Sequence, residues 1–160
     1  MTQRDCVQCN GRTQNNKRCT RSTCIYPGYC WQHAAAHYST KIKQSTIPNS
    51  GKGLFARRDL KPLEVIGPYD GIVTEEEIEG DYVLQNDKRH IDARSTQSCM
   101  ARYANACNTA NKKNKHCKGN NARFDKGPGG NVVLRVLGDP IKAGQEIFVS
   151  YDKYYNFAKK

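Results

Sequence analysis

Six cysteine and histidine side chains near the start of the chain could hold a metal ion, namely Cys6, Cys9, Cys19, Cys24, Cys30 and His33. A tetrahedral zinc site takes four such ligands, so this set is too large for one site and too small for two. The step Cys30-Trp31-Gln32-His33, at the start of a helix, would let both side chains face one ion. The second pair could be Cys9 with Cys19, Cys19 with Cys24, or Cys6 with Cys9.

The segment 1–40 needs a metal because it has almost no aliphatic residues apart from Val7 and Ile25. A segment this small cannot fold on hydrophobic burial alone, and a structural metal is the usual replacement for a core. Within it, Thr13 to Lys17 has the composition of a hairpin turn. Cys30 to Tyr38, which contains three consecutive alanines, favours a short helix.

Three later segments carry residues that could position a cofactor and a reacting side chain. The first begins Gly51-Lys52-Gly53, and it is not a phosphate-binding loop because Leu54-Phe55-Ala56 follows where that motif requires its third glycine and a helix. It predicts a backbone bend followed by a strand, where a ligand can approach the main chain. The other two segments are 101–107 and 146–151.

The order and spacing of these segments resemble SET-domain protein lysine methyltransferases, over residues 42–157. The stretch 45–56 is similar to the opening of the SET domain, which holds the methionine part of S-adenosylmethionine. Arg102-Tyr103-Ala104-Asn105 resembles the Arg-Phe-x-Asn of the family's cofactor motif. The stretch 142–151 is similar to the closing motif, which ends in the catalytic tyrosine.

The resemblance implies a role for each matching residue. Tyr151 is the expected catalytic residue, whose hydroxyl would orient the lysine amine and the methyl group. Cofactor binding is implied for Lys52, Gly53, Leu54, Arg102, Tyr103, Asn105, Ala106 and Tyr155. The substrate channel is expected to be lined by Tyr69, Tyr82, Val149 and Tyr151.

Two departures from the family pattern bear on these roles. Ala106 stands where most members have a histidine that contacts the adenine side of the cofactor. Val149 stands where the family often has the Phe or Tyr that limits how many methyl groups fit. The number of methyl groups transferred is therefore open.

The N-terminal segment has a resemblance of its own. Residues 9–13, 18–19 and 29–33 are similar to a small Cys/His motif attached to many proteins of large DNA viruses and some algae. This resemblance favours Cys9, Cys19, Cys30 and His33 as the ligands of a structural Zn²⁺, with Cys24 as the alternative ligand. The whole chain thus resembles viral and algal single-domain SET proteins that carry an N-terminal zinc motif.

From Lys41 onward, short apolar segments separated by Gly, Pro, Asn and Asp predict a mostly β fold with few short helices. The expected strands are 42–45, 53–56, 65–69, 82–85, 89–92, 132–136 and 146–150, with one helix at 96–106 and a loop at 108–126. The resemblance implies a β-clip-like SET fold with a pseudoknotted C-terminal segment. The expected domains are a zinc module at 1–40, a SET domain at 41–151 and a short aromatic tail at 152–160 without a cysteine cluster.

Charge and cysteine content limit the partners. The chain has 26 Lys and Arg against 15 Asp and Glu, a net charge of +11, which favours acidic partners such as nucleic acid or a nucleosome, although a solvated basic surface explains it equally well. No signal peptide or long apolar run is visible, so we expect no membrane partner and an intracellular protein, in the host nucleus if it acts on histones. In such a compartment the eight cysteines are expected to be free or metal-bound.

The resemblance implies an enzyme that transfers the methyl group of S-adenosylmethionine to a lysine side chain of a protein. A histone tail fits as the substrate. Two alternatives stay open, a lysine of a non-histone protein and a catalytically silent SET-like and zinc-binding module. The sequence does not decide the oligomeric state.

Overall fold

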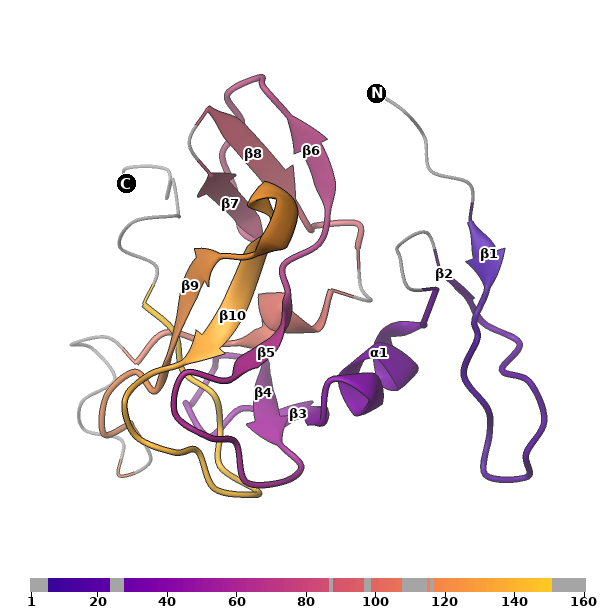
Figure 1. Cartoon of the computed structure of the whole chain (residues 1–160), viewed down its shortest axis with the longest axis horizontal. Coiled ribbons are helices and arrows are strands. Elements are labelled where there is room, and N and C mark those ends of the chain that lie inside the picture. The colour runs from indigo at the N-terminus through magenta and orange to yellow at the C-terminus, as the bar shows by residue number, and fades with distance from the viewer. Residues whose placement is uncertain are drawn as a thin grey trace.

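The computed structural model describes residues 6–23, 28–86, 88–96, 99–107, 115 and 117–150. In this part of the chain, small antiparallel sheets predominate and the only α-helix is short (Figure 1). The prediction of a mostly β fold with few short helices is therefore confirmed. None of the helices in the described ranges is long and apolar enough to cross a bilayer.

The N-terminal segment forms a hairpin followed by a helix. Strand β1 (Val7–Gln8) pairs with β2 (Ser22–Thr23), and the Thr13 N–H donates to the Lys17 carbonyl at 2.8 Å, which confirms the predicted turn. Helix α1 (Trp31–His37) confirms the predicted helix. The buried hydrophobic cluster between hairpin and helix consists of Cys9, Cys19 and Cys30, with Tyr29 packed against them, so sulfur occupies the place of an aliphatic core.

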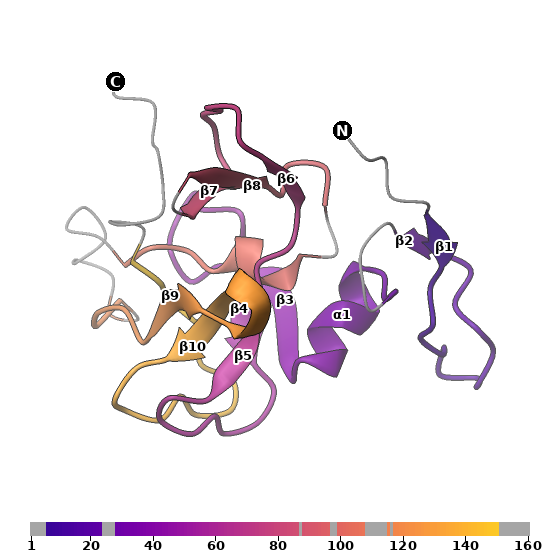
Figure 2. The same ribbon diagram turned by 45° about the horizontal axis from the view of Figure 1, so that its top comes forward.

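After α1, the described part of the chain contains three further antiparallel sheets (Figure 2). One pairs β3 (Thr40–Gln44) with β4 (Lys52–Ala56). The second has the order β5 (Val65–Pro68), β10 (Val132–Val136), β9 (Ala122–Lys126). The third has the order β6 (Ile72–Thr74), β8 (Arg89–Asp92), β7 (Val83–Asn86).

Six of the expected strands correspond to β3, β4, β5, β7, β8 and β10, with ends shifted by at most two residues. Strands β6 and β9 were not expected, and β9 occupies the end of the segment 108–126 that was expected to be a loop. The prediction of a strand at 146–150 is wrong in detail. In the described part of this segment, Glu146, Phe148 and Val149 form only isolated bridges, to three different segments.

The expected helix at 96–106 is also wrong. The structure has a short 3₁₀ turn, η1 (Met100–Tyr103), after which the backbone is extended. Asn105 forms a parallel bridge with Phe148, and the Val149 N–H donates to the Asn105 carbonyl at 2.9 Å. A backbone carbonyl that pairs with a neighbouring segment cannot also serve an α-helix, so tertiary pairing overrides the local helix preference.

The main core lies between the sheets and η1. Leu54, Met100, Leu134 and Ile147 are all fully buried in it. Ala35 of α1 belongs to the same core, and α1 packs on β3 and on η1. The N-terminal helix is therefore attached to the part of the molecule that carries the three candidate motifs.

Candidate active site and metal centre

A buried carboxylate joins the three motif segments. Glu146 is 5% exposed, and it accepts hydrogen bonds from the Ser45 hydroxyl at 2.7 Å and from the Thr46 N–H at 2.8 Å. The Thr46 hydroxyl and the Asn105 amide also donate to it. A buried carboxylate is tolerated only when such donors compensate its lost hydration. The sequence analysis assigned Glu146 no role. The feature that could have indicated one is a single acidic residue directly before the apolar residues 147–149.

The two glycines of the first motif have different surroundings. Gly51 has a φ of +65°, and no atom lies within 4 Å of the position a Cβ would take. A Cβ at Gly53 would lie 2.2 Å from Oε1 of Glu146. The predicted bend before a strand is confirmed, with β4 beginning at Lys52. The close approach at Gly53 is to Glu146, whereas Gly51 faces open space that a ligand can enter.

Asn105 braces the first motif against the second. Its Nδ2 donates to the Lys52 carbonyl at 3.1 Å as well as to Glu146. The Lys52 ammonium lies 5.0 Å from the centroid of the Trp31 ring, a cation–π contact to the N-terminal module. Leu54 has a fully buried side chain, and its carbonyl accepts from the Ile147 N–H at 2.7 Å. The structure thus brings the segments 51–54, 105 and 146–147 together.

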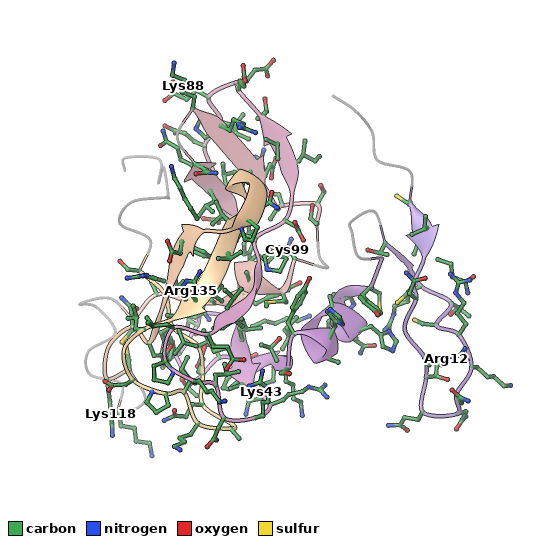
Figure 3. All side chains as sticks on the ribbon, in the orientation of Figure 1. Arg12, Lys43, Lys88, Cys99, Lys118 and Arg135 are labelled. Carbon is green, nitrogen blue, oxygen red and sulfur yellow. A yellow bond between two sulfur atoms is a disulfide. The ribbon has the colours of Figure 1, made fainter. Side chains whose placement is uncertain are left out.

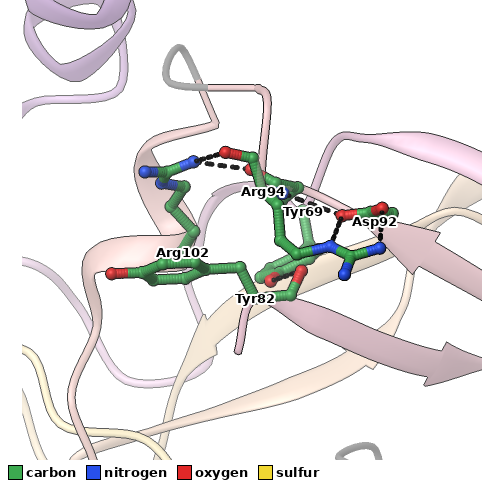
Figure 4. Close-up of polar contacts among 6 residues, drawn as sticks. Tyr69, Tyr82, Asp92, Arg94 and Arg102 are labelled. Atoms are coloured by element: carbon green, nitrogen blue, oxygen red, sulfur yellow. Dashed lines mark hydrogen bonds and ion pairs between the residues drawn. The ribbon is translucent and has the colours of Figure 1, made fainter. Parts of the chain in front are cut away.

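The residues expected to line the channel divide into an exposed and a buried group. Tyr82 is 37% exposed and has a φ of +64°, a conformation that a bulky residue adopts only when its surroundings impose it. Its carbonyl accepts from the Tyr69 hydroxyl at 2.9 Å, and Tyr69 itself is 2% exposed (Figure 4). Tyr69 therefore supports Tyr82 from the core side. Val149 is also fully buried.

Arg102 stacks on the aromatic pair beside this position. Its guanidinium carbon lies 4.3 Å from the centroid of the Tyr82 ring and 5.0 Å from that of Tyr103. It also donates to the Ala93 and Arg94 carbonyls at 2.6 and 3.0 Å (Figure 4). Arg102 therefore joins η1 to the residues that follow β8, with a cationic and aromatic surface at their junction.

An ion pair fixes the end of β8. Arg94 donates from its backbone N–H and its guanidinium to the Asp92 carboxylate, at 2.7 to 2.9 Å (Figure 4). The side-chain hydrogen bond from Arg94 lowers the pKa of Asp92. This pair holds the segment whose carbonyls Arg102 contacts.

Ala106 follows Asn105 and is partly exposed. Tyr151, Tyr155 and Cys24 lie outside the described residues. The roles expected for these four residues stay predictions.

The four favoured zinc ligands lie together. The Sγ atoms of Cys9, Cys19 and Cys30 and a ring nitrogen of His33 all lie within 4.8 Å of one another. Nδ1 of His33 is 3.4 Å from the Cys9 sulfur and 3.3 Å from the Cys30 sulfur, and the sulfurs of Cys19 and Cys30 are 4.0 Å apart. Ligand atoms around a tetrahedral zinc lie roughly 3.5 to 3.8 Å apart, given the usual bond lengths. The spacing of the group thus fits one zinc ion.

The surroundings of the four side chains also suit a metal. Nε2 of His33 donates to the Arg12 carbonyl at 2.9 Å, so that a neutral imidazole presents the lone pair of Nδ1 to the sulfurs. The N–H groups of Gly11 and Cys30 donate to the Cys9 sulfur at 3.3 and 3.1 Å. Burial raises the pKa of the Cys30 thiol, but hydrogen bonds from the backbone N–H groups of His33 and Gln32 and from the Cys9 side chain outweigh it and lower that pKa to about 6.

The remaining described cysteines of the SET region are not part of this group. Cys107 and Cys117 form a disulfide with their Cα atoms 5.5 Å apart, so the expectation of free or metal-bound thiols is wrong for this pair. The chain returns on itself here, because the Cys107 N–H donates to the Asn120 side chain at 3.0 Å. Cys99 is buried, and its burial raises the pKa of the thiol to about 12, which makes it unreactive.

Comparison with known proteins shows the family to which the chain belongs. The SET-domain family model matches residues 51–152, which is more than half of the chain. The chain belongs to the SET-domain family. It is accordingly a methyltransferase that uses S-adenosylmethionine to methylate lysine in a protein. The motif segments described above lie in this match, apart from residues 45–50 that precede it.

A solved structure supports the fold. The methyltransferase domain of human PR domain-containing protein 2 superposes with a TM-score of 0.53 over 80% of this chain and 85% of that domain. The two are 16% identical, so the similarity is one of fold. No curated protein matches the chain.

Proposed function

We propose that this SET-domain protein methylates a lysine in a strongly basic protein segment, a histone tail. The observation that carries this proposal is the connection between β6 and β7. Five of the seven residues from Glu75 to Asp81 are acidic, and all five are exposed. The run ends directly before Tyr82, the exposed tyrosine that contacts Arg102. A substrate with several Lys and Arg beside the target lysine would be attracted to this segment despite the net charge of +11.

The chemistry to be performed is the transfer of a methyl group from a sulfonium to a neutral amine. A lysine with its usual pKa of about 10.4 is almost entirely protonated at neutral pH, so the enzyme must favour the uncharged amine. An apolar channel does so by desolvation, and the hydroxyl of Tyr151 would orient the amine. S-adenosylmethionine, when bound, supplies the methyl group. The residues that would hold it are Lys52, Gly53, Leu54, Arg102, Tyr103, Asn105, Ala106 and Tyr155.

Two observations favour a cofactor at this place. Gly51 presents an open backbone, and Asn105 and Glu146 hold the 45–53 segment against the 105 and 146 segments. Segments held in fixed relative positions in this way meet the positioning requirement of a methyl transfer.

We also propose that Cys9, Cys19, Cys30 and His33 bind a structural zinc ion. The supporting observations are the spacing of the four ligand atoms and the tautomer of His33 set by Arg12. The site offers four protein ligands and no open position, which is typical of structural rather than catalytic zinc.

The substrate proposal is tested with radiolabelled S-adenosylmethionine, core histones, nucleosomes and a cell lysate. We expect histone labelling by the wild type and by Tyr29→Phe, a matched loss of one phenolic hydroxyl in the N-terminal module, but not by Tyr151→Phe. Equal labelling by Tyr151→Phe would remove the catalytic assignment. Labelling confined to other proteins of the lysate would identify a non-histone substrate. If calorimetry detected no cofactor binding, the chain would be a silent module.

A further inference from the structure

A second charged site lies on the outer side of β3 and β4. It is an open pocket of about 470 Å³ lined by Lys41, Lys43, Phe55, Ala56, Arg57 and Gly144. None of these residues belongs to the proposed cofactor, substrate or zinc sites. Lys43 lies at the opposite end of the molecule from β6 and β7, which the acidic 75–81 segment connects (Figure 3).

Local structure positions the three cations. Lys41 and Lys43 are two residues apart on β3 and so project from the same face of the strand, about 6.8 Å apart. The Lys43 ammonium lies 4.1 Å from the centroid of the buried Phe55 ring, and Lys41 is directly opposite Phe55 in the strand register. Nε of Arg57 donates to the Thr40 carbonyl at 2.8 Å, which anchors its guanidinium at the same edge.

These cations form no ion pair with an acidic side chain among the described residues, whereas five other surface cations do. Arg58, Arg94, Arg123, Arg135 and Lys142 all lie within 4.0 Å of a carboxylate. In the same part of the chain, Lys41, Lys43 and Arg57 form no such ion pair. Glu146 forms a bridge with Phe55, but its carboxylate is buried and accepts from Ser45 and Thr46. The pocket therefore carries uncompensated positive charge.

We propose that this pocket binds the phosphate backbone of double-stranded DNA. Exposed lysines and an anchored arginine neutralise phosphates without reading bases, which is how proteins contact DNA independently of sequence. The open shape suits an extended polyanion better than a small anion, which would need an enclosed site. The acidic 75–81 segment lies at the other end of the molecule, so DNA and a basic peptide would not compete for the same surface.

The test measures the binding of a fluorescent 20-base-pair duplex to the full chain by anisotropy, at several salt concentrations. At low salt we expect the double variant Lys41→Glu/Lys43→Glu to bind DNA at least roughly tenfold more weakly than the wild type. The magnitude of the negative slope of log K against log salt should decrease by about 2. The control is Lys88→Glu/Lys118→Glu, which makes the same charge change at exposed lysines elsewhere. A circular dichroism melt shows that each variant is folded.

Two results would overturn the assignment. If the control variant weakened DNA binding as much as the pocket variant, the affinity would come from total charge and not from this pocket. If polyglutamate bound as tightly as DNA and was lost in the same variant, the partner would be an acidic protein surface. Because the readout is DNA binding, it is independent of whether a histone is the methylated substrate.

Discussion

At the scale of single residues, Glu146 connects the parts of the cofactor region. Its carboxylate accepts from Ser45, Thr46 and Asn105, which belong to segments about 40 and 100 residues away in sequence. Asn105 is thereby fixed in turn, and its amide holds the Lys52 carbonyl. The arrangement indicates that Glu146 positions the cofactor motifs from behind instead of touching the cofactor.

Replacing Glu146 by Gln tests this role. An amide retains the shape but places a donor against donors, so the unfolding free energy should fall by about 1 to 3 kcal/mol. The dissociation constant of S-adenosylmethionine should rise as Asn105 and the 45–53 loop lose their common acceptor. Urea denaturation and calorimetry measure the two effects. The exposed Glu76→Gln should change stability by less than about 0.5 kcal/mol. Equal cofactor affinity in both variants would refute the positioning role.

At the scale of elements, the N-terminal module depends on its Cys and His side chains. The hairpin and α1 enclose three buried sulfurs, and no other buried hydrophobic cluster lies between them in the part of the chain that the structure describes. Helix α1 also contributes Ala35 to the main core and places Trp31 against Lys52. A change in the metal site should therefore alter the packing at the edge of the SET domain.

We expect His33→Gln to lose zinc and to lower the melting temperature, because removal of a metal ligand unfolds a module that has no core of its own. His37→Gln is the matched control, since His37 lies one turn later on the same helix and is exposed. Its zinc content should remain one ion per chain. Metal analysis after dialysis against a chelator and a thermal melt provide the measurements. Full zinc content in His33→Gln would exclude this residue as a ligand.

At the scale of the whole molecule, charge is unevenly distributed. The chain is strongly basic overall, yet a third of its 15 acidic residues lie between Glu75 and Asp81. The unpaired cations of the β3–β4 pocket lie at the other end (Figure 3). This separation gives one surface suited to a basic peptide and another suited to a polyanion.

Neutralising Glu75, Glu76 and Glu77 by Gln should raise the KM for a peptide with Lys and Arg beside the target lysine severalfold at low salt. The effect should shrink near 1 M salt, where charges are screened beyond roughly 3 Å. A peptide with neutral flanking residues serves as the control and should show no change, and cofactor affinity should also stay constant. Steady-state kinetics at two salt concentrations measure the difference. A similar rise for both peptides would show that the segment acts on folding instead of on charge.

The sequence by itself determined the features that are local. The Thr13–Lys17 turn, the helix after Cys30 and the strands β8 and β10 follow from composition over a few residues, and the structure confirms them. The order of the three motifs also identified the family, because it does not depend on how the segments pack. The set of zinc-ligand candidates was likewise readable, and the structure brings the favoured four together.

Tertiary structure decided what depends on contacts between distant segments. The 96–106 segment has helix-forming residues, but its helical part is limited to the 3₁₀ turn at 100–103, and Asn105 after it pairs with Phe148 in extended backbone. The β-bridges of residues 146–149 go to three different segments, so these residues form no regular strand. Glu146 has its role only because folding places hydrogen-bond donors beside its carboxylate. Lys41, Lys43 and Arg57 likewise form a positively charged pocket only because folding brings them together. Such contacts join residues up to about a hundred positions apart, and no local pattern encodes them.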